Sequence, residues 1–351
     1  MNNPKNYLTL VLLLFSFTAF AQYTDVINSN RPGESKSAFA VGKNVGQIEA
    51  GPFTVKDEHT PLKTEAKGFG IDFALRYGLL WEELEINIEG NYQNDTFKDN
   101  RSEFSPQEIK RSNFKNLALG AKYLVYDPYK NREEEKPNLY SYHANKKFKW
   151  RNLIPAVAVY GGVNYDAENN VYVPYTNPFT KPYYEGGVNF KAMVATQNNF
   201  SSGWVLVTNF LMERISTDYS SFQYIITLTK AINEQFVLFG ETQGISGDYY
   251  ADNLFRFGGA YLFGKDFQLD TAVTFNTKDT PSVFSLNFGA SYRLDFHKDP
   301  QVDNGTNAMD EYERRANKKR NKKNKNKDGD DSPDDTGKRK KETQVIDFDD
   351  E

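Results

Sequence analysis

Charged side chains recur at alternate positions between residues 46 and 296, usually with apolar neighbours on both sides. Such alternation puts the charges on one face of a β-strand and the apolar residues on the other. Two kinds of chemistry fit the charged face: an internal network of ion pairs, or a wet passage that selects solutes by charge. The candidate lining residues are Glu49, Asp72, Arg76, Glu85, Glu89, Lys122, Glu185, Lys191, Glu241, Arg256, Asp270 and Arg293.

The three histidines, His59, His143 and His297, offer little for catalysis. Nucleophilic hydrolysis on a wall of strands would need a histidine beside a serine. All three histidines fall in predicted turns or in the C-terminal tail, and no spacing of His or carboxylate residues resembles a metal site. The sequence therefore predicts a protein that is not an enzyme and needs no cofactor.

The elements that would position the charges are short strands with period-2 alternation. In residues 69–77, for example, Phe69, Ile71 and Leu75 face one way, while Asp72 and Arg76 face the other. Periods near 3.6 are weak, so few helices are expected. The pattern predicts an all-β protein, an antiparallel transmembrane β-barrel of about twelve strands. The predicted strands are 46–56, 69–77, 84–93, 114–126, 153–165, 184–196, 203–213, 220–230, 236–245, 253–263, 267–276 and 283–296.

Residues 1–21 read as a secretory signal peptide. Lys5 supplies the positive flank, Leu8 to Phe20 the apolar region, and Ala19-Phe20-Ala21 the small-x-small cleavage pattern. The apolar run is too short for a transmembrane helix. The chain has no cysteine, which excludes disulfides and a lipid anchor on Cys. A mean hydropathy of -0.69 still suits a barrel, because half of each strand faces a polar interior.

Link lengths predict the orientation of the barrel. Links after even-numbered strands are short, as at 79–83, whereas longer links at 57–67, 94–111 and 166–182 follow odd-numbered strands. Outer-membrane barrels have short periplasmic turns and longer outer loops, so both barrel ends should lie in the periplasm. Residues 127–152 break the rule. They form either a polar insertion, which we favour, or a further hairpin that would make fourteen strands.

The last predicted strand carries an assembly pattern: Asn287, Gly289, Tyr292, Leu294 and Phe296 follow the order polar, glycine, aromatic, apolar, terminal aromatic. This order resembles the closing-strand signal of outer-membrane β-barrels. The resemblance implies the bacterial outer membrane as location, with membrane lipid and the barrel-assembly machinery as partners.

A second resemblance lies near the N-terminus. Asn30-Arg31-Pro32, then Val41-Gly42 and Gly46-Gln47-Ile48-Glu49-Ala50-Gly51, are similar to the opening signature of a bacterial barrel family. That family is named for the MetA pathway of phenol degradation, and its members are commonly labelled transporters. Asn30 stands for the usual Asp, and Gly42 stands where the family has Pro. The resemblance covers about residues 22–296 and does not identify a substrate.

Two segments flank the predicted barrel, 46–296. Residues 22–45 are either a linker packed outside the lumen or a plug, since they begin at the periplasmic mouth. Residues 297–351 hold 14 Lys or Arg and 15 Asp or Glu, which predicts a disordered polyampholyte tail in the periplasm. The partner of the tail is unknown, and its compartment argues against nucleic acid.

Together these patterns favour an outer-membrane channel or transporter-like barrel for small solutes, apolar or aromatic ones included. The alternative is a structural or adhesion barrel that binds a partner through its loops or tail without transport. Conductance of the purified protein would distinguish the two.

Overall fold

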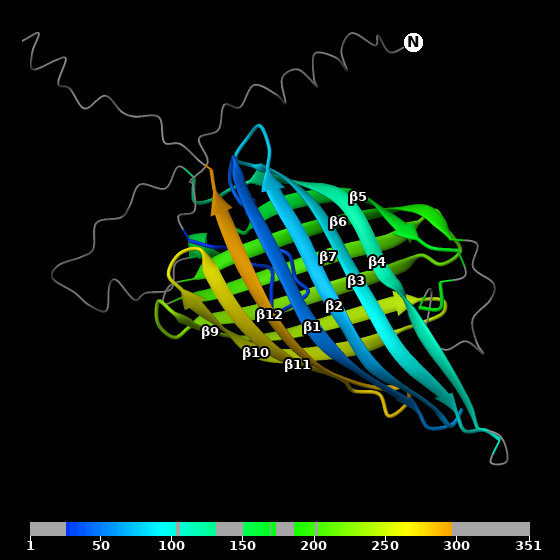
Figure 1. Ribbon diagram of the computed structural model, residues 1–351. Helices are drawn as coiled ribbons and strands as arrows, with labels where there is room; N and C mark the ends of the chain where they lie inside the picture. Colours follow the sequence, from blue (N-terminus) through cyan, green and yellow to red (C-terminus); the bar gives the residue numbers. More distant parts are fainter. Residues whose placement is uncertain are drawn as a thin grey trace, which may run out of the picture. The chain divides into compact units, whose positions relative to one another are not determined.

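Twelve antiparallel strands form one closed barrel, with β1 paired to β12 (Figure 1). The computed structural model describes residues 26–102, 106–130, 150–168, 170–172, 186–200 and 203–296, without the side chains of Trp150 and Arg151. The predicted signal peptide, Glu185 and the tail lie outside these ranges. The strands are β1 (Val45–His59), β2 (Thr64–Gly78), β3 (Leu84–Asp99), β4 (Gln107–Tyr126), β5 (Ala156–Asp166), β6 (Gly187–Phe200), β7 (Trp204–Ile215), β8 (Ser221–Ala231), β9 (Phe236–Gly247), β10 (Asp252–Phe263), β11 (Phe267–Asn276) and β12 (Ser282–Asp295), and a 3-10 helix, η1 (Trp150–Leu153), precedes β5.

The twelve-stranded prediction is confirmed. β4 pairs directly with β5, with Ala118 opposite Asn164. Among the described residues, the barrel therefore closes with no strand between β4 and β5, and residues 131–149 lie outside the described part of the chain.

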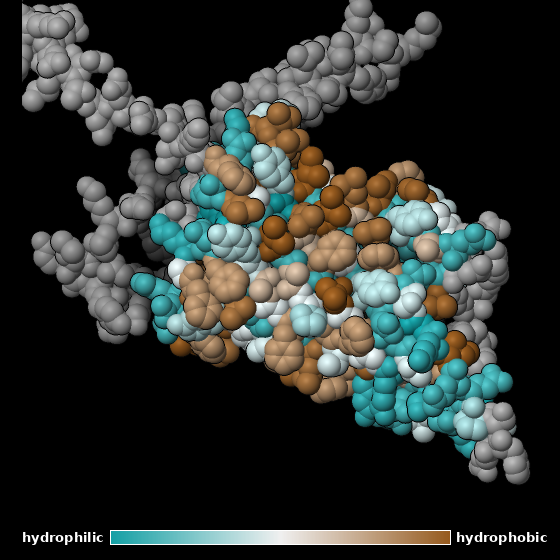
Figure 2. Space-filling model, viewed as in Figure 1, coloured by the Kyte–Doolittle hydropathy of each residue, from teal (hydrophilic) through white to brown (hydrophobic). Residues whose placement is uncertain are grey.

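The barrel has polar side chains inside and apolar side chains outside, the reverse of a water-soluble protein. Arg76 in β2 is 2% exposed, whereas its neighbours Leu75 and Tyr77 are 44% and 41% exposed. The same alternation in the other strands gives an apolar outer surface, seen as brown side chains over the middle of the barrel in Figure 2. An apolar belt around a polar interior is the surface of a transmembrane barrel. In the described ranges, no helix is long and apolar enough to cross a membrane.

The first four strands are longer than the sequence predicts. Strands β1 to β4 have 15, 15, 16 and 20 residues, and the links between them shrink to 60–63 and 100–106. The prediction of long loops at 57–67 and 94–111 is therefore wrong. In these hairpins polar residues occupy both faces, so the alternation disappears while the backbone pairing continues. Figure 2 shows the hairpin ends as a hydrophilic extension beyond the apolar surface.

Candidate functional site

Residues 26–44, here called the inner loop, enter the barrel and return to the same rim. Near one end, the Ile27 N–H donates to the Lys265 carbonyl in the β10–β11 link (2.8 Å). At the other end, the Asn44 N–H donates to the Gly78 carbonyl at the end of β2 (3.0 Å). Between these points the inner loop contacts side chains that point inward from strands all around the wall, as the following clusters show.

A cluster of four buried charges holds the returning half of the inner loop. Arg76 forms a two-pronged pair with Glu85 (Nε to Oε1 and Nη2 to Oε2, both 2.9 Å) and reaches Glu49 at 3.0 Å. Lys122 lies 3.3 Å from Glu85, so two cations balance two carboxylates. The Lys122 ammonium also donates to the carbonyls of residues 37 and 39 (2.9 and 3.0 Å). The cluster is thus bonded to the inner loop as well as to itself.

The deepest turn of the inner loop rests on Glu241 of β9. The Glu241 carboxylate accepts the N–H groups of Glu34 (3.1 Å) and Ser35 (3.2 Å), as well as Arg256 Nη1 (2.9 Å). Gly33 completes this contact, because a β-carbon there would overlap the carboxylate and lie 3.2 Å from its Cδ. Glycine at residue 33 lets the backbone approach the anion closely.

Lys36 is bound at both its backbone and its side chain. Its N–H donates to Asn209 Oδ1 (2.6 Å), and Asn209 Nδ2 donates to its carbonyl (2.9 Å), as a neighbouring strand would. Its ammonium pairs with Glu89, which also accepts Lys191 Nζ (2.8 Å). Burial lowers the pKa of Lys36, while the Glu89 carboxylate acts in the opposite direction.

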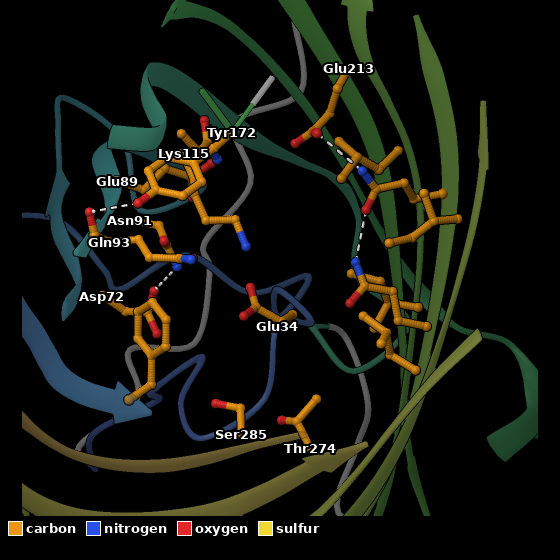
Figure 3. A pocket seen from close by; sticks show the side chains of 18 of the residues that line it. Glu34, Asp72, Glu89, Asn91, Gln93, Lys115, Tyr172, Glu213, Thr274 and Ser285 are labelled. Atoms are coloured by element: carbon orange, nitrogen blue, oxygen red, sulfur yellow. Dashed lines mark hydrogen bonds between the residues drawn. The ribbon is translucent and has the colours of Figure 1, made fainter. Parts of the chain in front are cut away.

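A cavity of about 470 Å³ lies between the deepest turn of the inner loop and the far ends of the strands. Residues 30–34 and Lys36 of this turn form part of its lining. Figure 3 shows Glu34 projecting into it, with Asp72, Asn91 and Tyr172 on one wall and Glu213 on the opposite wall. The aromatic residues that line it are Phe53, Phe73, Tyr172, Tyr219, Tyr249, Tyr250 and Phe284.

Most of the charged residues predicted from the sequence point into the barrel, but they bind one another, the inner loop or other polar residues of the wall. Asp72 and Glu89 are half-buried, and Asp72 accepts a hydrogen bond from Asn91. Asp270 lies 3.4 Å from Arg31, and Arg293 lies 3.3 Å from Asp295. Glu185 lies outside the described residues. The buried members are Glu49, Arg76, Glu85, Lys122, Lys191, Glu241, Arg256, Asp270 and Arg293.

In the closing strand, Asn287 is buried while Tyr292 and Phe296 are exposed on the outer surface, with Leu294 half-buried. Gly289 lies under the Arg31 side chain. Their role as an assembly signal stays a prediction.

Sequence reasoning missed the residues that bind the inner loop through neutral groups, chiefly Asn209 and Gln197. Gln197 Oε1 accepts the Ser37 hydroxyl (2.8 Å). Asn209 occupies an inward position of a predicted strand, so parity rather than charge could have identified it. Gln197 lies just past the predicted strand 184–196, because β6 continues to Phe200. The buried pair of Asp95 and Arg111 (2.7 Å) was missed because it lies in a stretch predicted to be a link.

These observations define a transmembrane β-barrel whose lumen is occupied, near one rim, by its own N-terminal segment. The family model described as "Putative MetA-pathway of phenol degradation" matches residues 29–294, and the chain belongs to this family. The match includes both the inner loop and the barrel. No curated protein matches the chain in sequence.

Several solved structures are similar at low identity. An outer-membrane channel from Pseudomonas putida F1 has 10% identity and a TM-score of 0.46, covering 76% of this chain and 100% of its own. The transport unit of the autotransporter AIDA-I from Escherichia coli has 11% identity and a TM-score of 0.44, and the match covers 83% of this chain and 99% of the other. The toluene transporter TodX of Pseudomonas putida has 9% identity and a TM-score of 0.40, and the match covers 79% of this chain and 99% of the other.

Proposed function

We propose that the protein is an outer-membrane channel for small solutes, closed at its periplasmic half by the inner loop. The observation that carries this proposal is the bonding of residues 28–41 to inward side chains around the wall, with a cavity beyond them. A folded loop that a few side chains fix can open without disturbing the strands.

Link lengths and the rim contacts support the orientation. The inner loop begins and ends at the rim that carries the short links 79–83 and 264–266, and short links are periplasmic in bacterial barrels. The Phe296 N–H donates to the Asn44 carbonyl (3.1 Å), so the barrel also ends at this rim. We therefore assign the cavity to the outer side and the 297–351 tail to the periplasm.

The cavity suits one small molecule, because binding pockets for such ligands typically measure about 300–1,000 Å³. Its aromatic side chains favour solutes with apolar or aromatic parts. Many of its charges are already paired, as in Lys191 with Glu213 (3.1 Å). Membrane lipid against the apolar belt, and the barrel-assembly machinery, complete the partners that we propose.

Swelling of liposomes that carry the purified protein tests the proposal. We expect slow swelling with small solutes, and faster swelling of Asn209→Leu, which removes both amide bonds to Lys36. A protein that folds but lets no solute through in either form, and still binds a partner through its hairpins or tail, would favour the structural or adhesion barrel.

A further inference from the structure

The hydrogen-bond ladder between the first and last strands has a gap at Pro52. The register pairs Ala50 with Ala290 and Phe53 with Asn287, which puts Pro52 opposite Phe288. At this point of an antiparallel ladder an N–H of β1 should donate to the Phe288 carbonyl. Proline has no N–H, so the ladder cannot make this bond.

Arg31 of the inner loop supplies a donor at this gap. Its Nη2 donates to the Phe288 carbonyl at 3.1 Å. The Arg31 Nε lies 3.4 Å from Asp270 Oδ1 on β11, and Gln268 Nε2 donates to the main-chain carbonyl of Arg31 at 3.1 Å. The Arg31 side chain is 11% exposed, and Phe288 lies on the outer, membrane-facing surface, where lipid offers no donor to replace a missing one at its carbonyl.

Two glycines make room for the guanidinium group. A β-carbon at Gly51 would lie 2.7 Å from Arg31 Cζ, and one at Gly289 would lie 2.6 Å from the same atom. These glycines face each other across the β1–β12 seam, as the register of Ala50 with Ala290 implies. Neither Gly51 nor Gly289 has a positive φ. Glycine is therefore needed at these two residues because it lacks a side chain, not because of its backbone conformation.

We propose that Gly51, Pro52, Phe288, Gly289 and Asp270 form a guanidinium site in the β1–β12 seam, and that Arg31 completes the barrel wall by binding there. The inner loop then has two parts. Residues 28–32 belong structurally to the seam, whereas residues 33–41 are the part that can move when the channel opens. This division rests on the seam geometry and does not depend on which solute is transported.

A double-mutant cycle in detergent tests the proposal through thermal unfolding. Arg31→Ala should lower the midpoint temperature by roughly 5 °C or more. Pro52→Ala restores an N–H opposite Phe288, so Arg31→Ala should cost clearly less in that background, where only the Asp270 contact is lost. An equal loss in both backgrounds would overturn the proposal. If Arg31→Ala alone does not fold, recovery of the heat-modifiable barrel by Pro52→Ala is the supporting result, and no recovery is the contrary one.

Two further measurements separate a specific site from general destabilisation. Gly289→Ala should destabilise the protein that contains Arg31 but have little effect on Arg31→Ala, because the added methyl group collides with the guanidinium. Millimolar methylguanidinium should raise the midpoint temperature of Arg31→Ala, while methylammonium should not. The guanidinium site would be contradicted if Gly289→Ala and Arg31→Ala lowered the midpoint temperature additively and the two cations changed it equally. Failure of solute transport would leave these outcomes unchanged.

Discussion

Gly33 lies against the carboxylate of Glu241, with no space between them for a β-carbon. Gly33→Ala should therefore push the deepest turn of the inner loop off Glu241 and weaken its bonds to the N–H groups of Glu34 and Ser35. We expect a higher channel conductance in planar bilayers with little change in barrel stability. Gly161→Ala is the matched control, because nothing lies within 4 Å of a β-carbon at Gly161. Unchanged conductance in Gly33→Ala would show that the Glu241 contact does not hold the loop closed.

The two faces of β12 should respond differently to a positive charge. Leu286 lies opposite Val273 on the outer surface, whereas Asn287 is buried and lines the cavity. Leu286→Arg should cost about 2–4 kcal/mol of folding free energy if the residue is near the membrane midplane. Asn287→Arg should be tolerated, because the side chain can extend into the cavity. Equal losses in urea unfolding from lipid vesicles would contradict the assignment of the two faces.

The closing strand should be required for assembly. Tyr292 and Phe296 are both exposed on the outer surface, so replacing both with Ser removes apolar area from the lipid-facing side and the proposed assembly signal. We expect the double variant to fail to reach the membrane and to be degraded. Heat-modifiable migration on a gel gives the readout. Normal migration of the double variant would show that Tyr292 and Phe296 are not required for assembly.

The proposed orientation can be checked with single cysteines, because the chain has none of its own. Asn100→Cys lies in the β3–β4 link and Glu234→Cys in the β8–β9 link, at opposite ends of the barrel and both exposed. A maleimide that cannot cross membranes should label the first on intact cells and the second only after lysis. The reverse pattern would invert the barrel and place the tail outside the cell.

The strands could be predicted because period-2 alternation is strong wherever one face meets lipid and the other meets polar groups. The prediction fails in the hairpins beyond Lys56 and Gln93. Polar residues occupy both faces there, so the strands pair without any hydrophobic alternation in the sequence. Arg76 and Glu85 could be placed inside the barrel by parity alone. Their contacts with the inner loop could not be predicted. Lys122 donates to the Ser37 carbonyl and Glu85 accepts the Val41 N–H, and these partners lie far apart in the sequence.

Arg31 illustrates a different limit. The family signature identifies it, but its contact with Phe288 depends on a register that brings the first and last strands together. The sequence left open whether residues 22–45 are a plug or a linker, because polar composition suits both. The hydrogen bonds of Glu34, Ser35 and Lys36 to the wall support the plug.

The central claim, that the inner loop closes the lumen, is tested most directly by single-channel conductance after deletion of residues 24–40. The deletion should be made in the Pro52→Ala background, so that the seam keeps its hydrogen bond without Arg31, and compared with Pro52→Ala alone. We predict a folded barrel with a several-fold higher conductance. A folded deletion variant whose conductance equals that of the full chain would contradict the account.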